Sequence, residues 1–219
     1  MSGKKFAALA LGLGVVAFAA LALMLGGSTS REPAGASAPA GSDALVRAHS
    51  PIKGRADAPV TIVEFLDPEC ESCRAMYPIV ESILAEYAGR VRLVVRYVPL
   101  HSSSVLAAAS LEEARELGKY EEALEVLFAK QPTWGSHHDP RPELIAQYLA
   151  DIGIDPARLR AEVVIPKHRS KIEQDAADAA ALGVSRTPVL FVNGARLATL
   201  GYGPLRRAVE AALSASQPS

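Results

Sequence analysis

The stretch VTIVEFLDPECESCRAMYPIVESIL covers residues 60–84 and contains both cysteines of the chain, Cys70 and Cys73. Its first part is apolar and rich in β-branched side chains, which predicts a buried strand over 60–66. The part after the cysteines repeats apolar residues at helical spacing, which predicts a helix over 72–88. A Cys-x-x-Cys pair between a strand and a helix is the arrangement of a dithiol redox site.

Cys70 would lie at the amino end of this helix, where the helix dipole and unpaired backbone N–H groups favour a thiolate over a thiol. The thiolate is the reactive form of cysteine. Two other uses of the pair fit the sequence less well. A structural zinc site needs about four ligands, and nothing in the sequence places His137 and His138 near the cysteines. A structural disulfide between Cys70 and Cys73 would close a very short loop and remove little entropy from the unfolded chain.

The amino-terminal residues predict the compartment. Lys4 and Lys5 precede an uncharged apolar run over 6–25, which is long enough to cross a bilayer with the lysines on the cytoplasmic side. Residues 1–27 are therefore predicted to be a signal anchor in the inner membrane or, alternatively, a cleaved signal peptide. Both alternatives export the rest of the chain. Residues 28–48 are rich in Ala, Ser, Gly and Pro and are predicted to form a flexible linker.

The remaining residues, 49–215, are expected to form one domain of ordinary size. A formal net charge of −1 gives no reason to expect a nucleic-acid partner. The sequence contains neither a glycine-rich phosphate loop nor a Gly-x-Ser-x-Gly elbow, and no cofactor or metal is predicted. No segment is typical of a separate dimerisation domain, so a monomer is expected.

The rest of this domain predicts a second strand, a block of helices and a hairpin. Gly118 is predicted to divide the first helical stretch, and Pro132 and Pro142 to bracket a loop. The dipeptide Asn193-Gly194 is a strong signal for a two-residue hairpin turn. The predicted elements are a strand over 91–98, helices over 103–130, 142–151, 156–162 and 167–182, a strand over 189–192, its partner over 195–198, and a helix from Pro204 to about Leu213.

Four segments together resemble the DsbA-like thioredoxin-fold family of exported thiol–disulfide oxidoreductases. GRADAPVTIVEF at 54–65 is similar to the family's entry into its first core strand, and CESC at 70–73 matches its active site. Residues 117–134 resemble its helical insertion, and GVSRTPVLFVNG at 183–194 matches the segment with the cis-proline loop. The resemblance runs over about 51–213.

The resemblance implies an α/β thioredoxin fold with a central helical insertion over about 101–182, preceded by an N-terminal transmembrane or signal helix. By position, Cys70 is implied to be the nucleophile that forms a mixed disulfide with a partner protein, and Cys73 the resolving cysteine. Pro188 is implied to be cis and to pack beside Cys70. Thr187, just before it, is implied to offer its backbone to an extended substrate segment by strand addition.

Glu64 lies in the predicted strand before Cys70 and matches an acidic residue beneath the active site in the family. Among apolar neighbours its carboxylate is costly unless it has a partner or a role. Burial should raise its pKa and let it pass protons to or from Cys73. The alternative is a strand-end residue that reaches solvent or pairs with Arg92 or Arg96.

The residues around the cysteines depart from the family pattern. Familiar oxidant members carry Pro-His between the cysteines, whereas this chain carries Glu71 and Ser72, with Glu69 just before Cys70. Two carboxylates should disfavour the Cys70 thiolate, and Ser72 could donate a compensating hydrogen bond. A less stabilised thiolate means a less oxidising dithiol. The sequence therefore predicts either a weaker oxidant than typical relatives or a reductase or isomerase.

The leading hypothesis is a periplasm-facing thiol–disulfide oxidoreductase, tethered to the inner membrane, that acts on exported proteins and exchanges electrons with an unidentified redox partner protein. The alternative is a copper-handling or metallochaperone protein in which Cys70, Cys73 and Met76 supply soft sulfur ligands. A third hypothesis is a binding protein on a thioredoxin scaffold in which the cysteines are incidental.

Overall fold

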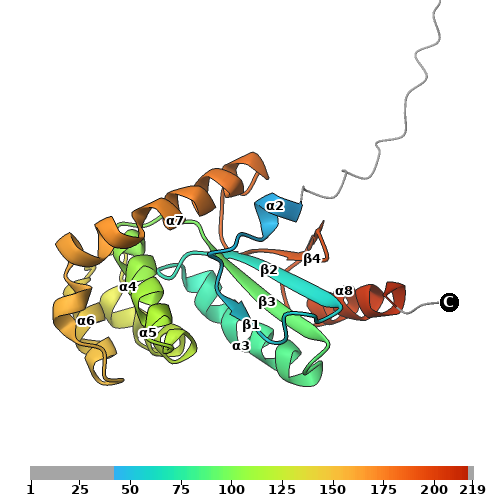
Figure 1. The fold of residues 1–219 in the computed structure, drawn as a ribbon, viewed down its shortest axis with the longest axis horizontal. Helices are drawn as coiled ribbons and strands as arrows, with labels where there is room; N and C mark the ends of the chain where they lie inside the picture. The colour runs from blue at the N-terminus through green and yellow to red at the C-terminus, as the bar shows by residue number, and fades with distance from the viewer. Residues whose placement is uncertain (1–41, 217–219) are drawn as a thin grey trace, which may run out of the picture. The chain divides into compact units, whose positions relative to one another are not determined.

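The computed structural model describes residues 42–216, which fold around a five-stranded sheet (Figure 1). The strands lie in the order β1-β3-β2-β4-β5. β2 and β3 are parallel, and the other neighbouring pairs are antiparallel. The strands are β1 (Ile52–Lys53), β2 (Val60–Leu66), β3 (Val91–Tyr97), β4 (Val189–Val192) and β5 (Ala195–Arg196).

Helices account for most of the remaining chain. They follow the predicted order of one helix between the parallel strands, a helical block before β4, and one helix at the carboxyl end. The helices are α2 (Ser42–Leu45), α3 (Glu71–Glu86), α4 (Ser104–Glu116), α5 (Tyr120–Trp134), α6 (Glu143–Ala150), the 3₁₀ helix η1 (Pro156–Leu159), α7 (Ala161–Ala181) and α8 (Tyr202–Ala215).

The sheet is covered on both faces, which explains why its central strands are apolar along most of their length. α3 and α8 pack on the face where Ile62 and Leu190 enter the larger core. α2 and α7 cover the other face, where Val63, Phe65 and Phe191 are buried (Figure 1). β1, by contrast, is a two-residue edge strand with an exposed Ile52, and the sequence does not predict it.

The parallel pair β2 and β3 positions the start of α3. Their register runs from Val60 opposite Val91 to Leu66 opposite Tyr97. α3 crosses between them, so its amino end lies at the carboxyl edge of β2. It ends shortly before Gly89, whose φ of 77° lies in the left-handed region that glycine adopts without steric cost.

The helical block differs from the prediction at two prolines. α5 continues through Pro132 to Trp134, so the predicted loop begins only at Gly135. The Trp134 indole is fully buried and donates to the Leu127 carbonyl at 2.8 Å, which fixes this last turn. α7 begins at Ala161 rather than at 167 and runs through Pro166. The segment predicted as a helix over 156–162 is a short 3₁₀ helix followed by the start of α7.

The folded domain begins earlier than predicted. The expected linker over 28–48 is wrong in its last part, because α2 packs against α7 through buried Leu45 (Figure 1). Arg47 fixes this segment with two hydrogen bonds to the Asp178 carboxylate, at 2.8 and 2.6 Å. The predicted signal segment over 1–27 lies outside the described residues. Within 42–216, every helix is too short or too polar to cross a bilayer.

Candidate dithiol active site

Cys70 lies where β2 passes into α3. The chain leaves β2 at Leu66 and turns, with the Cys70 N–H donating to the Asp67 carbonyl at 3.0 Å. Cys70 immediately precedes α3, and its own carbonyl accepts from the Arg74 N–H at 3.1 Å. The helix therefore begins at the first cysteine, in the position that the sequence predicts.

The two sulfurs occupy different environments. Both cysteines are free thiols, with Cys70 9% exposed and Cys73 1% exposed. The pKa of Cys70 is lowered to about 5 by hydrogen bonds from the Cys73 thiol, from the Thr187 side chain and from the backbone N–H groups of Cys73 and Ser72, which outweigh its partial burial. Burial instead raises the pKa of Cys73. At neutral pH the site therefore holds one reactive thiolate and one protonated thiol.

Glu69 and Glu71, predicted to disfavour the Cys70 thiolate, are not among the main influences on its pKa. The Glu69 carboxylate is buried and accepts the Ser103 N–H at 2.7 Å and the Ser104 hydroxyl at 3.3 Å. These donors lie at the amino end of α4, where a negative charge is stabilised. Glu71 is exposed to solvent in the first turn of α3. The pKa of Cys70 is lowered despite these two neighbouring carboxylates, because the hydrogen bonds to its sulfur dominate.

Thr187 lies against Cys70, although it is far from it in the sequence. The peptide bond between Thr187 and Pro188 is cis. The Cys70 thiol donates to the Thr187 carbonyl at 3.5 Å. With Cys70 as a thiol, the buried Thr187 hydroxyl makes no hydrogen bond among the described residues. It contributes to the lowered pKa of Cys70, because a hydroxyl can donate to the thiolate once the proton has left.

Glu64 is buried beneath the site, 4% exposed. Burial is the main reason why its pKa is raised to about 8, and the charges of Cys70 and Glu81 add to the shift. The charge of Glu64 also contributes to the raised pKa of Cys73, so the two groups interact electrostatically. At neutral pH the Glu64 carboxyl is therefore protonated, and so is the Cys73 thiol with which it interacts.

Neither of the arginines considered as partners for Glu64 pairs with it. Arg92 donates to the Thr61 hydroxyl at 2.9 Å and to the Ala56 carbonyl at 2.7 Å. Arg96 lies on the opposite face of the sheet, where it donates to the buried carboxylates of Asp175 and Asp178 at 2.7 and 2.6 Å. The alternative interpretation of Glu64 as half of an ion pair is therefore wrong.

Two residues that support the active-site turn have no signal in the sequence analysis. Asp67 is fully buried, and its carboxylate accepts the N–H groups of Glu69 and Leu100, each at 2.8 Å, and contacts His101 Nδ1 at 2.7 Å. Gln131 donates to the carbonyls of Pro68 and Cys70 at 2.8 and 3.1 Å. Together they attach the turn before Cys70 to the segment between β3 and α4 and to α5.

The histidines predicted to lie on a solvated loop come close to this turn. His137 stacks on His101 with ring centroids 4.8 Å apart. His137 and His138 line a polar hollow together with Glu71 and Arg74 of α3. The sequence contains no local pattern that places this loop beside the cysteines.

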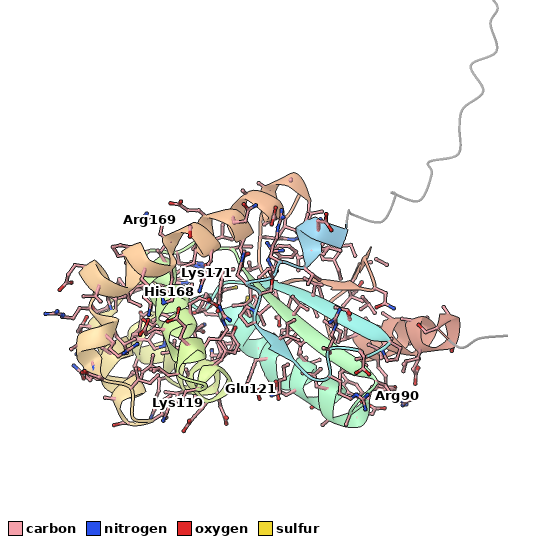
Figure 2. All side chains as sticks on the ribbon, viewed as in Figure 1. Arg90, Lys119, Glu121, His168, Arg169 and Lys171 are labelled. Atoms are coloured by element: carbon pink, nitrogen blue, oxygen red, sulfur yellow. The ribbon has the colours of Figure 1, made fainter. Side chains whose placement is uncertain are left out.

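One cluster in the described part of the chain has the composition of a metal site, and it lies away from the cysteines. Glu113, Glu116 and His168 bring three potential ligand atoms within 4.8 Å of one another. Lys167 forms ion pairs with both carboxylates, at 2.5 and 2.7 Å. Figure 2 shows His168 and Lys171 between α7 and α4, where Lys171 adds a further positive charge. The acidic charge of the cluster is thus already neutralised by protein cations.

A groove runs beside Pro188, and we name it the cis-proline groove. It connects the first turn of α3 with the segment that follows β5, and the cis-proline segment forms its floor. Its lining residues are Ser72, Arg186, Thr187, Pro188, Val189, Arg196, Leu197, Ala198 and Leu200.

Comparisons with known proteins agree with this geometry. The sequence profile of the thioredoxin family matches residues 47–211. Oxidised BdbD from Bacillus subtilis is 27% identical with a TM-score of 0.69, and the match covers 76% of this chain and 94% of that one. A thioredoxin-like oxidoreductase from Silicibacter pomeroyi is 28% identical with a TM-score of 0.67, covering 79% of this chain and 98% of that one.

A curated relative shares only this domain. The chain is 34% identical over 146 residues to a protein of Herminiimonas arsenicoxydans named Na(+)/H(+) antiporter NhaA. The match covers 67% of this chain and 22% of that protein, so the chain spans about a fifth of the length of the curated relatives it matches. The family profile shows that the chain belongs to the thioredoxin family, and the solved structures share its fold.

Proposed function

We propose that the protein is an oxidant that donates the Cys70–Cys73 disulfide to exported proteins. The observation that carries this proposal is the opposite shift of the two thiol pKa values, lowered to about 5 at Cys70 and raised at Cys73. A stabilised thiolate favours the reduced form of a dithiol, and a dithiol that favours reduction oxidises its partners. This direction selects the oxidant among the alternatives that the sequence leaves open, and a Cys70 pKa of about 5, above the value of about 3.5 in DsbA, fits an oxidant weaker than DsbA.

The exchange proceeds in two steps. A client thiolate attacks the Cys70 sulfur of the disulfide, and the Cys73 sulfur leaves with the bonding electrons and takes up a proton. A second client thiolate then attacks the client sulfur of the mixed disulfide, and Cys70 leaves as a thiolate. The client loses two electrons and gains a disulfide, while the protein becomes the dithiol. A redox partner protein must remove these two electrons before the next cycle.

Glu64 is proposed to supply the proton that the leaving Cys73 sulfur takes up. Its carboxyl, with a pKa of about 8, is protonated at neutral pH and electrostatically coupled to Cys73. A proton donor with a pKa near the working pH is suited to both directions of transfer. In re-oxidation the same carboxyl group would accept the proton of Cys73 as a carboxylate.

The client is proposed to bind as an extended segment beside Thr187. The Thr187 carbonyl lies 3.5 Å from the Cys70 sulfur, so a client cysteine bonded to Cys70 is carried next to this backbone. Backbone hydrogen bonds would hold any sequence there, as in strand addition. This mode of binding fits an enzyme that accepts many clients.

The compartment of action is proposed to be extracytoplasmic. The apolar run over 6–25, preceded by Lys4 and Lys5, supports export of the folded domain. A protein that remains attached to the inner membrane and one released by cleavage behind residue 27 would carry the same dithiol to the same side.

The raised pKa of Cys73 argues against the copper-handling alternative. A metal site on the dithiol needs both sulfurs as thiolates, and burial disfavours the Cys73 thiolate. Met76, the third sulfur ligand considered, is a residue of α3 whose side chain is buried in the core. The geometry therefore supports exchange of disulfides over binding of a soft metal.

The redox equilibrium of the purified protein with graded glutathione buffers tests the direction. A Cys70 pKa of about 5 stabilises the reduced form by about 3 kcal/mol at pH 7, relative to an ordinary thiol, which corresponds to about 60 mV. We expect a potential well above the value of about −270 mV for thioredoxin. A potential at or below that value would contradict the proposed role as an oxidant.

Trapping of mixed disulfides tests the roles of the two cysteines. Cys73→Ser should accumulate mixed disulfides with exported proteins through Cys70, since the resolving sulfur is missing. Cys70→Ser is the matched control and should trap none. If the two variants trap equally, or if activity survives in Cys70→Ser, the assignment of Cys70 as the exchanging sulfur is wrong.

A further inference from the structure

The cis-proline groove carries positive charge. Arg186 and Arg196 are both exposed and are its only charged lining residues. No carboxylate lines the groove. A segment bound along the cis-proline segment therefore meets positive charge in the groove itself, and Glu71 is the exposed carboxylate that precedes the groove at the start of α3.

Neither arginine is neutralised within the described part of the chain. Arg186 makes no ion pair and no side-chain hydrogen bond among residues 42–216, and Arg196 donates only to the Gly183 carbonyl, at 3.2 Å. Some other exposed arginines of the domain pair with carboxylates, as Arg55 does with Asp57 at 2.7 Å, whereas Arg90 makes no ion pair among the described residues. The two groove arginines are thus available to a carboxylate that arrives with a partner.

The wall of the groove adds an apolar contact. Leu200 is 43% exposed and Leu197 is half-buried, and both line the groove after β5. An exposed leucine beside two unpaired cations suits a segment that presents one apolar and one acidic side chain. A segment with basic side chains would leave the cations facing like charge, which costs affinity.

The reach of Arg186 places the acidic residue close to the client cysteine. Arg186 precedes Thr187, whose carbonyl lies 3.5 Å from the Cys70 sulfur. A client sulfur would lie about 2 Å from that sulfur. Extended residues advance about 3.3 Å each, so side chains two residues from the client cysteine lie about 7 Å away along the strand. That distance is within the length of an arginine side chain.

We infer that the cis-proline groove selects clients that carry acidic side chains within two residues of the reacting cysteine, through Arg186 and Arg196. The inference rests on the proposed exchange at Cys70 and adds the class of client. Each exposed arginine–carboxylate pair favours binding by up to about fivefold, so exchange of Arg for Glu at both positions should shift client preference about tenfold. The preference should shrink with added salt, since exposed charges are screened.

The test compares three reduced dithiol peptides that differ only in having Glu, Gln or Lys two residues before and two residues after the first cysteine. The second-order rate constant for their oxidation by the oxidised protein is measured for the wild type and for the Arg186→Glu/Arg196→Glu double variant. The ratio of wild type to variant cancels the intrinsic reactivity of each peptide. Uncharged dithiothreitol corrects for any change at Cys70 itself.

The expected ratio is about tenfold higher for the Glu peptide than for the Lys peptide, with the Gln peptide between them. Arg90→Glu is the matched control, since Arg90 is exposed, makes no ion pair, and lies beyond the far end of α3 (Figure 2). This variant should leave the three ratios equal. Equal ratios in the double variant, with exchange intact, would overturn the selectivity alone. A wild type that oxidises none of the peptides and no dithiothreitol would instead overturn the proposed exchange.

Discussion

The raised pKa of Glu64 makes a strong prediction about stability. The carboxyl has a pKa of about 8 in the reduced folded protein, against an ordinary value of 4.5 in the unfolded chain. Between these values the unfolded state is ionised while the folded state holds a proton. The folded state therefore binds more protons, and the contribution of Glu64 to stability falls as the pH rises from 4.5 to about 8.

Each pH unit in this window costs about 1.4 kcal/mol. The cost of keeping Glu64 buried is thus near zero at pH 4, about 3 kcal/mol at pH 7 and about 5 kcal/mol above pH 8. Glu64→Gln keeps the shape of the side chain and removes the titration. We expect the free energy of unfolding of the variant, relative to the wild type, to rise by about 3 kcal/mol between pH 4 and pH 7.

Urea unfolding of both reduced proteins at several pH values measures this difference. Glu122→Gln, an exposed change on α5, is the control and should show a difference that stays constant with pH. The difference in the free energy of unfolding between Glu64→Gln and the wild type should be smaller in the oxidised protein. The charge of Cys70 contributes to the raised pKa of Glu64, and this charge is absent in a disulfide. A Glu64→Gln difference that does not change between pH 4 and pH 7 would show that the carboxyl is ionised at neutral pH.

Three further changes test the surroundings of the site. Thr187→Val removes a donor to the thiolate and should raise the pKa of Cys70 by about one unit, measured by thiolate absorbance; an unchanged midpoint would contradict the role of the hydroxyl. Glu69→Ala leaves buried donors at the start of α4 unpaired and should lower the free energy of unfolding by about 2 kcal/mol. The pKa of Cys70 should not fall; a marked fall would show that Glu69 does act on the thiolate. Arg96→Met leaves the buried Asp175 carboxylate without its cation and should cost about 3–5 kcal/mol, whereas a loss below about 1 kcal/mol would mean that another group neutralises it.

The central part of the fold follows from local patterns in the sequence. β2 and β3 are predictable because both of their faces are buried, which requires continuous apolar and β-branched residues. The start of α3 follows from the position of Cys70, and the hairpin of β4 and β5 from Asn193-Gly194. Each of these signals lies within the element that it specifies.

Two helix boundaries differ from the prediction at prolines. Pro132 and Pro166 lie inside α5 and α7, each less than two turns from a helix end. A proline removes one backbone donor, and packing of the remaining side chains can outweigh that loss. At Pro132 the outweighing contact is the buried Trp134, whose indole bonds back to Leu127.

The charges at the site depend on contacts that no local pattern reveals. Glu69 is next to Cys70 in the chain, yet its carboxylate bonds to Ser103 and Ser104 on another element. Proximity in the sequence therefore does not make Glu69 one of the main influences on the pKa of Cys70. Glu64, farther from Cys70 in the sequence, is the carboxyl whose charge reaches both cysteines.

The division of labour between the two cysteines follows from their places on one helix. Cys70 precedes the first turn of α3, so the backbone N–H groups of Ser72 and Cys73 are unpaired in the helix and available to its sulfur. Cys73 lies on the inward face of that turn, where the core and Glu64 disfavour its charge. Moving the pair along the helix would remove this difference, because both thiols would then have ordinary helical neighbours. A spacing of two residues at a helix start thus exposes one sulfur to the helix N–H groups and buries the other, and Thr187 and Glu64 strengthen the difference between their pKa values.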